Sequence, residues 1–218
     1  DNVKNTPWSI EFDMDGNLIC SSLADIKLLK NNKFSNWEES KKLLNPFSNN
    51  ILRDSRNRLW FLHLDAISVL DNNEVKHFPN NNFKGYALVS IFEDHNQDIW
   101  LGTTKGLIRI QNEHCILNPF NMIAGFMVKT IFQDSQNRIW TGSVMDGLVF
   151  WKNNHLNKIK IPVNNTIFYC FHEDKNQNIW IGTDNGILIY KNDGSINHIN
   201  NNDPHIGNII YSLTRIGD

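Results

Sequence analysis

Short apolar runs alternate with polar turns along most of this chain. In one stretch, an apolar, β-prone run begins at Tyr86, and later segments alternate apolar and polar residues. The expected strands are residues 86–93, 98–103, 107–111 and 115–118. Strands of about four to eight residues bounded by Asn, Asp and Gly are typical of antiparallel hairpins. Doubled asparagines, as at 31–32 and 72–73, mark tight turns because Asn tolerates left-handed backbone conformations.

Helical periodicity is almost absent. One candidate is residues 36–44, where Trp37, Lys41 and Leu44 share a face behind Asn36, a suitable N-cap. The pattern therefore predicts an all-β chain with at most one short helix.

The strand pattern repeats together with a motif in which a tryptophan follows an aspartate by six positions. The pairs are Asp54 and Trp60, Asp94 and Trp100, Asp134 and Trp140, and Asp174 and Trp180, which places the tryptophans 40 residues apart. An eroded copy, Asp13 to Ile19, begins 41 residues before Asp54. Four antiparallel strands in each such repeat are the pattern of a β-propeller blade, whereas HEAT and armadillo repeats of this length are helical.

The repeat divides the chain into blade units. We expect an all-β propeller whose units cover residues 8–47, 48–87, 88–127, 128–167 and 168–207, with a further blade beginning in 208–218. The innermost strand of that last unit is expected over residues 209–216. Seven blades at this period need roughly 280 residues, so we expect the chain to be part of a longer, seven-bladed protein. The alternative is a closed five-bladed ring, in which the strand from Ile209 completes a sheet near Trp8.

Composition narrows the possible partners. The 218 residues carry a net charge of −2 and no basic cluster, which argues against nucleic acid as a partner. No apolar run reaches the length of a membrane span, so we expect no membrane insertion by this segment. The three cysteines, Cys20, Cys115 and Cys170, are odd in number and lack metal-type spacing. They are expected to be buried free thiols, and no metal or cofactor is predicted.

The motif resembles the two-component regulator propeller repeat. The likeness rests on the aspartate turn, a strand ending in Trp-x-Gly-Thr and a following Gly-Leu, which residues 91–111, 131–152 and 171–191 match closely and the first two copies match in part. The resemblance implies the periplasmic sensor propeller of a bacterial inner-membrane protein, which detects oligosaccharides and signals to a histidine kinase. It also implies as partners an oligosaccharide or similar small ligand, the remaining blades and signalling domains of the same protein, and a second copy in a homodimer.

The repeated residues are expected to form the scaffold. The four motif tryptophans fill the space between neighbouring sheets, and the four motif aspartates open a hairpin turn and bind its backbone N–H groups. Gly106, Gly147 and Gly186 supply turn conformations that side chains resist.

Function is expected where the repeat varies. In a four-stranded meander, the loops between blades and the loops between strands two and three emerge on one face. The candidate ligand-binding residues on these loops are Tyr86, Lys105, Phe126, Asp146, Asp184 and Asn185, and Lys129 and Tyr169 occupy equivalent positions on innermost strands that line the central channel.

Two other functions remain open, and no catalytic residue is predicted. One is a protein-interaction propeller module. The other is a propeller enzyme resembling the streptogramin lyases, which carry comparable repeats with a catalytic His and Glu on one face. His63 is the sole histidine expected in a loop of the ligand face, and no Glu is clearly paired with it.

Overall fold

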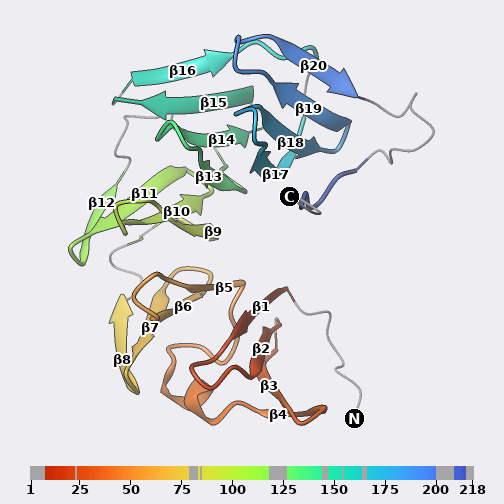
Figure 1. Cartoon of the computed structure of the whole chain (residues 1–218). Helices are drawn as coiled ribbons and strands as arrows, with labels where there is room; N and C mark the ends of the chain where they lie inside the picture. The colour runs from red at the N-terminus through yellow and green to blue at the C-terminus, as the bar shows by residue number, and fades with distance from the viewer. Residues whose placement is uncertain are drawn as a thin grey trace. The chain divides into compact units, whose positions relative to one another are not determined.

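A computed structural model describes residues 8–22, 24–78, 83, 85–117, 127–143, 147–153, 155–163, 166–199 and 209–214. These residues form five four-stranded antiparallel sheets whose strands pair in the order of the chain (Figure 1). The sheets are β1–β4, β5–β8, β9–β12, β13–β16 and β17–β20. The predicted all-β propeller fold is therefore confirmed.

Each sheet occupies one repeat of the sequence. The first contains Ser9–Phe12, Leu18–Ser21, Ile26–Lys30 and Lys33–Asn36, and the second Asn50–Arg53, Leu59–Leu62, Ile67–Asp71 and Glu74–Phe78. The third contains Leu88–Glu93, Ile99–Thr103, Gly106–Gln111 and His114–Leu117. The fourth contains Ile131–Gln133, Ile139–Ser143, Gly147–Lys152 and His155–Ile159, and the fifth Phe168–Glu173, Ile179–Thr183, Gly186–Tyr190 and Ile196–Ile199.

The chain divides into two compact units. The N-terminal unit comprises residues 1–104 and 110–115, and the C-terminal unit comprises residues 105–109 and 116–218. In the N-terminal unit, Ile19, Trp37, Ile51 and Phe61 belong to one buried cluster shared by the first two sheets. In the C-terminal unit, a second cluster joins the fourth and fifth sheets, where Trp140 packs 4.7 Å from Phe150, measured between ring centroids.

A single carboxylate organises the first turn of each blade. In the third sheet, Asp94 Oδ1 accepts the backbone N–H groups of Asn96 at 2.8 Å and Asp98 at 3.0 Å, as in an Asx turn. Its other oxygen accepts the indole N–H of Trp100 at 2.8 Å. The turn and the tryptophan are thus held by one side chain. The same three bonds occur at Asp54, Asp134 and Asp174.

Asparagine supports the other tight turns through its backbone. Asn31 and Asn32, between β3 and β4, have φ of 50° and 59°, and Asn72 and Asn73, between β7 and β8, have φ of 45° and 68°. Two successive positive φ angles are those of the type I′ turn, whose twist matches that of the flanking strands.

Neighbouring sheets are also joined by hydrogen bonds at the aspartate turns. Glu93, at the end of β9, accepts the backbone N–H of Ser55 at 2.7 Å and its hydroxyl at 2.8 Å. In the C-terminal unit, Glu173 accepts the same two groups of Ser135, at 2.7 and 2.6 Å. A serine directly after the motif aspartate therefore ties its turn to the next sheet.

Two predicted elements differ from the structure. The helix expected over 36–44 is a 3₁₀ helix over Glu38–Lys42, with Trp37 rather than Asn36 as its N-cap and no side-chain cap bond. Pro46 follows a few residues later, and its ring disfavours helical backbone angles at the preceding Asn45, so the helix does not extend through 44 and 45. The described residues 209–214 do not form the strand expected from Ile209; the backbone N–H of Ile210 instead bonds the carbonyl of Thr183 at the end of β18.

The cysteines are free thiols, but they are half-buried rather than buried. Burial raises the pKa of each thiol above its ordinary value. These thiols therefore remain protonated at neutral pH.

Replacing a motif aspartate should lower the free energy of unfolding much more than replacing Asp13, its counterpart in the eroded first copy. Asp134→Ala leaves the indole of Trp140, two backbone N–H groups and the buried guanidinium of Arg138 without their acceptor. We expect a loss of about 3–5 kcal/mol in the free energy of unfolding, measured by urea titration with tryptophan fluorescence. The control is Asp13→Ala, whose turn contains no tryptophan, with an expected loss of about 1 kcal/mol. Equal losses would contradict the role of the indole and guanidinium bonds.

Acid should remove the contribution that the ionised Asp174 makes to the stability of the fold. Burial opposes ionisation of this carboxyl, but hydrogen bonds from Trp180, Asn178 and Asn176 outweigh it and lower its pKa below 3.8. A depressed folded-state pKa stabilises the protein above the unfolded value, and the contribution is lost as pH falls through the folded value. The difference in Tm between the wild type and Asp174→Asn should therefore narrow between pH 7 and about pH 2.5. A difference that stays constant over this range would contradict the assignment.

Candidate functional site

Two side chains of the C-terminal unit, Lys129 and Tyr211, contact Tyr169 on β17. The ammonium of Lys129, two residues before β13, lies 5.6 Å from the centroid of the Tyr169 ring, within the range of a cation–π contact. The ring of Tyr211 lies on Tyr169 at 4.9 Å between centroids, with an interplanar angle of 61°. Lys129 and Tyr211 are exposed and Tyr169 is half-buried, so this cluster, the Tyr169 cluster, presents two aromatic rings and an amine to solvent.

A glycine in the motif allows the segment with Tyr211 to come close. Ile210 donates its backbone N–H to the carbonyl of Thr183 at 2.9 Å, which places residues 209–214 against the end of β18. A Cβ on Gly182 would lie 2.6 Å from the Ile210 carbonyl oxygen and 2.5 Å from Cys170 Sγ. A side chain at this position is therefore excluded, which explains the glycine of the Trp-x-Gly motif here.

The turn between β18 and β19 lies close to the same strand. Asp184 accepts the backbone N–H of Ile167 through Oδ1 at 3.0 Å, and its own N–H donates to the Ile167 carbonyl at 3.3 Å. Asn185 donates from Nδ2 to the hydroxyl of Thr166 at 3.4 Å, while its carbonyl is bonded to His198 Nε2 at 2.7 Å. Asp184 and Asn185 are thus held against the residues that lead into β17.

The surroundings of Tyr169 favour its neutral phenol. Burial is the largest cause that raises the pKa of Tyr169, the interaction with the Tyr211 phenol is the next, and the negative charge of Asp184 raises it further. The hydroxyl can then donate a hydrogen bond at neutral pH, beside an amine that donates and a carboxylate that accepts. Such a set can bind a neutral polar molecule that has an apolar face.

The other predicted ligand residues lie elsewhere or outside the described part of the chain. Tyr86 is half-buried and donates its backbone N–H to Phe83 O at 2.8 Å, in a turn that delays the start of β9 to Leu88. Lys105 is exposed in the turn between β10 and β11. Phe126 and Asp146 lie outside the described residues.

Sequence reasoning missed Tyr211 as a member of the cluster. The repeat relates Lys129 to Tyr169 by 40 residues, but the same step from Tyr169 falls on Ile209, two residues short of Tyr211. The available signal was an aromatic residue within the innermost strand expected over 209–216, which a strict 40-residue step passes over.

His63 cannot act as an exposed catalytic base. Its side chain is fully buried, with Nδ1 2.7 Å from the Phe47 carbonyl and Nε2 2.9 Å from the Ser68 hydroxyl. Burial is also the largest cause that lowers the pKa of this imidazole. Over the described ranges, no three His, Cys, Asp or Glu side chains converge as a metal site.

One part of the chain matches a known family. The family model described as "Two component regulator propeller" matches residues 162–185, which include β17 and the motif Asp174 and Trp180. The predicted resemblance is therefore confirmed for this repeat. No curated protein sequence matches the chain significantly. No helix among the described residues is long and apolar enough to cross a membrane.

Solved propeller structures share the fold at low identity. The extracellular domain assigned to hybrid two component system BT4673 of B. thetaiotaomicron is 18% identical with a TM-score of 0.74, over 97% of this chain and 30% of that one. A catalytically inactive virginiamycin B lyase from Staphylococcus aureus, crystallised with quinupristin, is also 18% identical, with a TM-score of 0.72 over 91% of this chain and 71% of that one. PorZ of Porphyromonas gingivalis, described as a surface component of the type-IX secretion system, is 15% identical. Its TM-score is 0.68 over 94% of this chain and 35% of PorZ. The chain thus spans about 30% of the BT4673 domain.

Adding a methyl group at Gly182 should detach the segment that carries Tyr211. In Gly182→Ala, the new Cβ meets the backbone of Ile210, so we expect the amide of Ile210 to lose protection in hydrogen–deuterium exchange. Overpacking of this kind costs about 1–3 kcal/mol. Gly16→Ala serves as the control: its φ of +79° strains an alanine, but a Cβ there meets nothing within 4 Å and lies in the N-terminal unit, so Ile210 should keep its protection. Unchanged protection of Ile210 in Gly182→Ala would contradict the proposed close approach.

Proposed function

We propose that this chain is part of the extracytoplasmic sensor propeller of a two-component regulatory system and lies in the bacterial periplasm. It binds an oligosaccharide or a similar small ligand, and the signal passes to a histidine kinase in another part of the same protein. This region itself is a binding module rather than an enzyme.

The observation that supports this proposal best is the position of the Tyr169 cluster within the repeat that matches the family. Tyr169 lies inside residues 162–185, on the first strand of its blade, and is flanked by Lys129 and Tyr211. Rings provide apolar area against the C–H face of a sugar, and the amine, carboxylate and amide of Lys129, Asp184 and Asn185 provide hydrogen bonds for its hydroxyl groups.

An exposed apolar row supports the expectation of further blades. On β1 and its flanks, alternate side chains are exposed although they are large and apolar: Trp8 (54%), Ile10 (59%), Phe12 (54%) and Met14 (60%). Ile51 is the equivalent of Ile10 on the first strand of the second sheet. Its side chain is only 5% exposed, because it packs in a cluster with Ile19 of the first sheet. We propose that another blade covers the row around Ile10 as the first sheet covers Ile51.

Signalling requires the ligand to bind two arrangements of the protein with different affinity. A ligand that contacts both Tyr169 and Tyr211 would stabilise the arrangement in which residues 209–214 lie against Gly182. A homodimer or the neighbouring signalling domain would then respond to that change.

Two alternatives have specific support. The same exposed row around Ile10 would suit a protein-interaction module, in which another protein rather than a blade covers it. The likeness to virginiamycin B lyase favours a lyase-like enzyme, but His63, the one histidine expected in a loop of the ligand face, is fully buried.

The proposal predicts a ligand-dependent rise in Tm that depends on Tyr169. The full chain is melted in the presence of a panel of oligosaccharides. A ligand at about 100 times its Kd stabilises by roughly 2.7 kcal/mol, or about 5–10 °C for a domain of this size. Tyr169→Ala should abolish the shift, because it removes the central ring of the cluster.

Phe34→Ala is the matched control, since Phe34 is a partly exposed ring on β4 of the N-terminal unit. It should keep the ligand shift of the wild type. A shift that survives in Tyr169→Ala would place the ligand elsewhere, and a panel without any shift would favour the protein-interaction module.

A further inference from the structure

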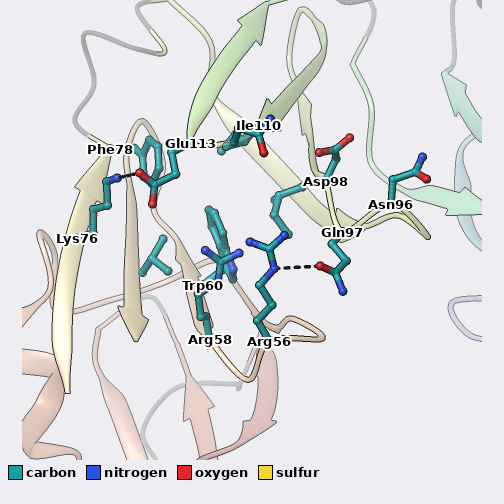
Figure 2. A pocket seen from close by; sticks show the side chains of 13 residues that line it. Arg56, Arg58, Trp60, Lys76, Phe78, Asn96, Gln97, Asp98, Ile110 and Glu113 are labelled. Carbon is teal, nitrogen blue, oxygen red and sulfur yellow. Dashed lines mark hydrogen bonds and ion pairs between the residues drawn. The ribbon is translucent and has the colours of Figure 1, made fainter. Parts of the chain in front are cut away.

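A polar hollow opens between the second and third sheets, within the N-terminal unit (Figure 2). Its free volume is about 100 Å³. Arg56 and Arg58, from the aspartate turn before β6, line it together with Lys76 on β8 and Glu113 in the turn between β11 and β12. Its apolar wall is formed by Trp60, Val69, Phe78, Ile99 and Ile110.

The corresponding place in the C-terminal unit is filled. Phe150 pairs with Trp140 across its ladder as Val69 pairs with Trp60, and Tyr190 follows Trp180 by ten residues as Ile110 follows Trp100. The rings of Trp140, Phe150 and Tyr190 surround the guanidinium of Arg138 at 4.9, 5.2 and 5.6 Å from their centroids. The Arg138 side chain is consequently 7% exposed, against 15% for its counterpart Arg58. The hollow exists because Val69 and Ile110 replace two aromatic rings.

The charges around the hollow leave one guanidinium without a counter-ion. Arg58 is paired with Asp54 through Nε at 2.7 Å, and Lys76 is paired with Glu113. Arg56 donates from Nε to the amide oxygen of Gln97 at 3.0 Å, and in the described part of the chain it makes no ion pair. Figure 2 shows this bond and the guanidinium of Arg56 at the side of the hollow. At the corresponding position, the C-terminal unit has the neutral Gln136.

The remaining polar groups suit hydroxyl groups. The amides of Asn96, Gln97 and Asn112 and the carboxylate of Asp98 line the hollow. Each can accept a hydrogen bond from a hydroxyl, and the amides can also donate one. Guanidinium groups bind carboxylates with two parallel hydrogen bonds, which gives both strength and direction.

From these features we infer that the hollow is a second ligand site, which binds a small hydroxycarboxylate. Its carboxylate binds Arg56 and the Nη groups of Arg58, and its hydroxyl groups bind the surrounding amides and Asp98. The site is separate from the Tyr169 cluster and does not depend on the function proposed for that cluster.

Paired probes test this inference on the full chain. D-Gluconate and D-glucitol match in length and hydroxyl groups and differ in the carboxylate, and their binding is measured by isothermal titration calorimetry. Gluconate should bind about tenfold more tightly than glucitol. Arg56→Gln should remove this preference, and its fold should be intact because Gln136 occupies the same position in the C-terminal unit.

A second variant and a control separate the hollow from general charge effects. Val69→Phe combined with Ile110→Tyr restores the two rings of the filled interface and should abolish gluconate binding while leaving a cooperative thermal transition. Lys175→Gln removes an exposed positive charge from the turn before β18 and should leave gluconate affinity unchanged. Equal affinity for the two probes, undiminished gluconate binding in Arg56→Gln, or no gluconate binding at about 10 mM would overturn the inference.

Discussion

The hydrogen bond from the motif tryptophan to the motif aspartate is the interaction on which four of the five blades depend. One carboxylate, such as that of Asp134, closes the first hairpin turn through backbone N–H groups and also binds the indole at the start of the second strand. The fully buried indole thereby finds an acceptor, and the buried carboxylate finds donors. Because one side chain serves both, the turn, the register of the first two strands and the position of the large ring are set together.

Packing between blades follows from this anchored ring and from a glycine. In the last two blades, the tryptophan is the second residue of the second strand, and the glycine two residues later lets the next segment of chain approach. In the C-terminal unit, a Cβ on Gly142 would lie 2.3 Å from the ring of Phe168, and one on Gly182 would meet Ile210. The second contact brings Tyr211 to Tyr169. The candidate site is thus a consequence of the same close approach that packs the blades.

Variation around the constant scaffold creates the chemical differences between blades. Both units have an arginine that binds the motif aspartate, Arg58 and Arg138. Three rings enclose Arg138, whereas smaller side chains around Arg58 leave a hollow. A change from ring to aliphatic side chain at two positions therefore converts a filled interface into a cavity without altering strand order.

The sequence by itself determined the repeat, the strand order within a blade and the tight turns, because hairpins and Asx turns depend on neighbouring residues. It also placed Lys129 and Tyr169 at equivalent positions and pointed to Asp184 and Asn185. Only the tertiary structure decided which of these side chains meet, since contacts between blades join residues about 40 positions apart. Tyr211, the burial of His63 and the hollow beside Arg56 depend on such packing, which no local pattern encodes.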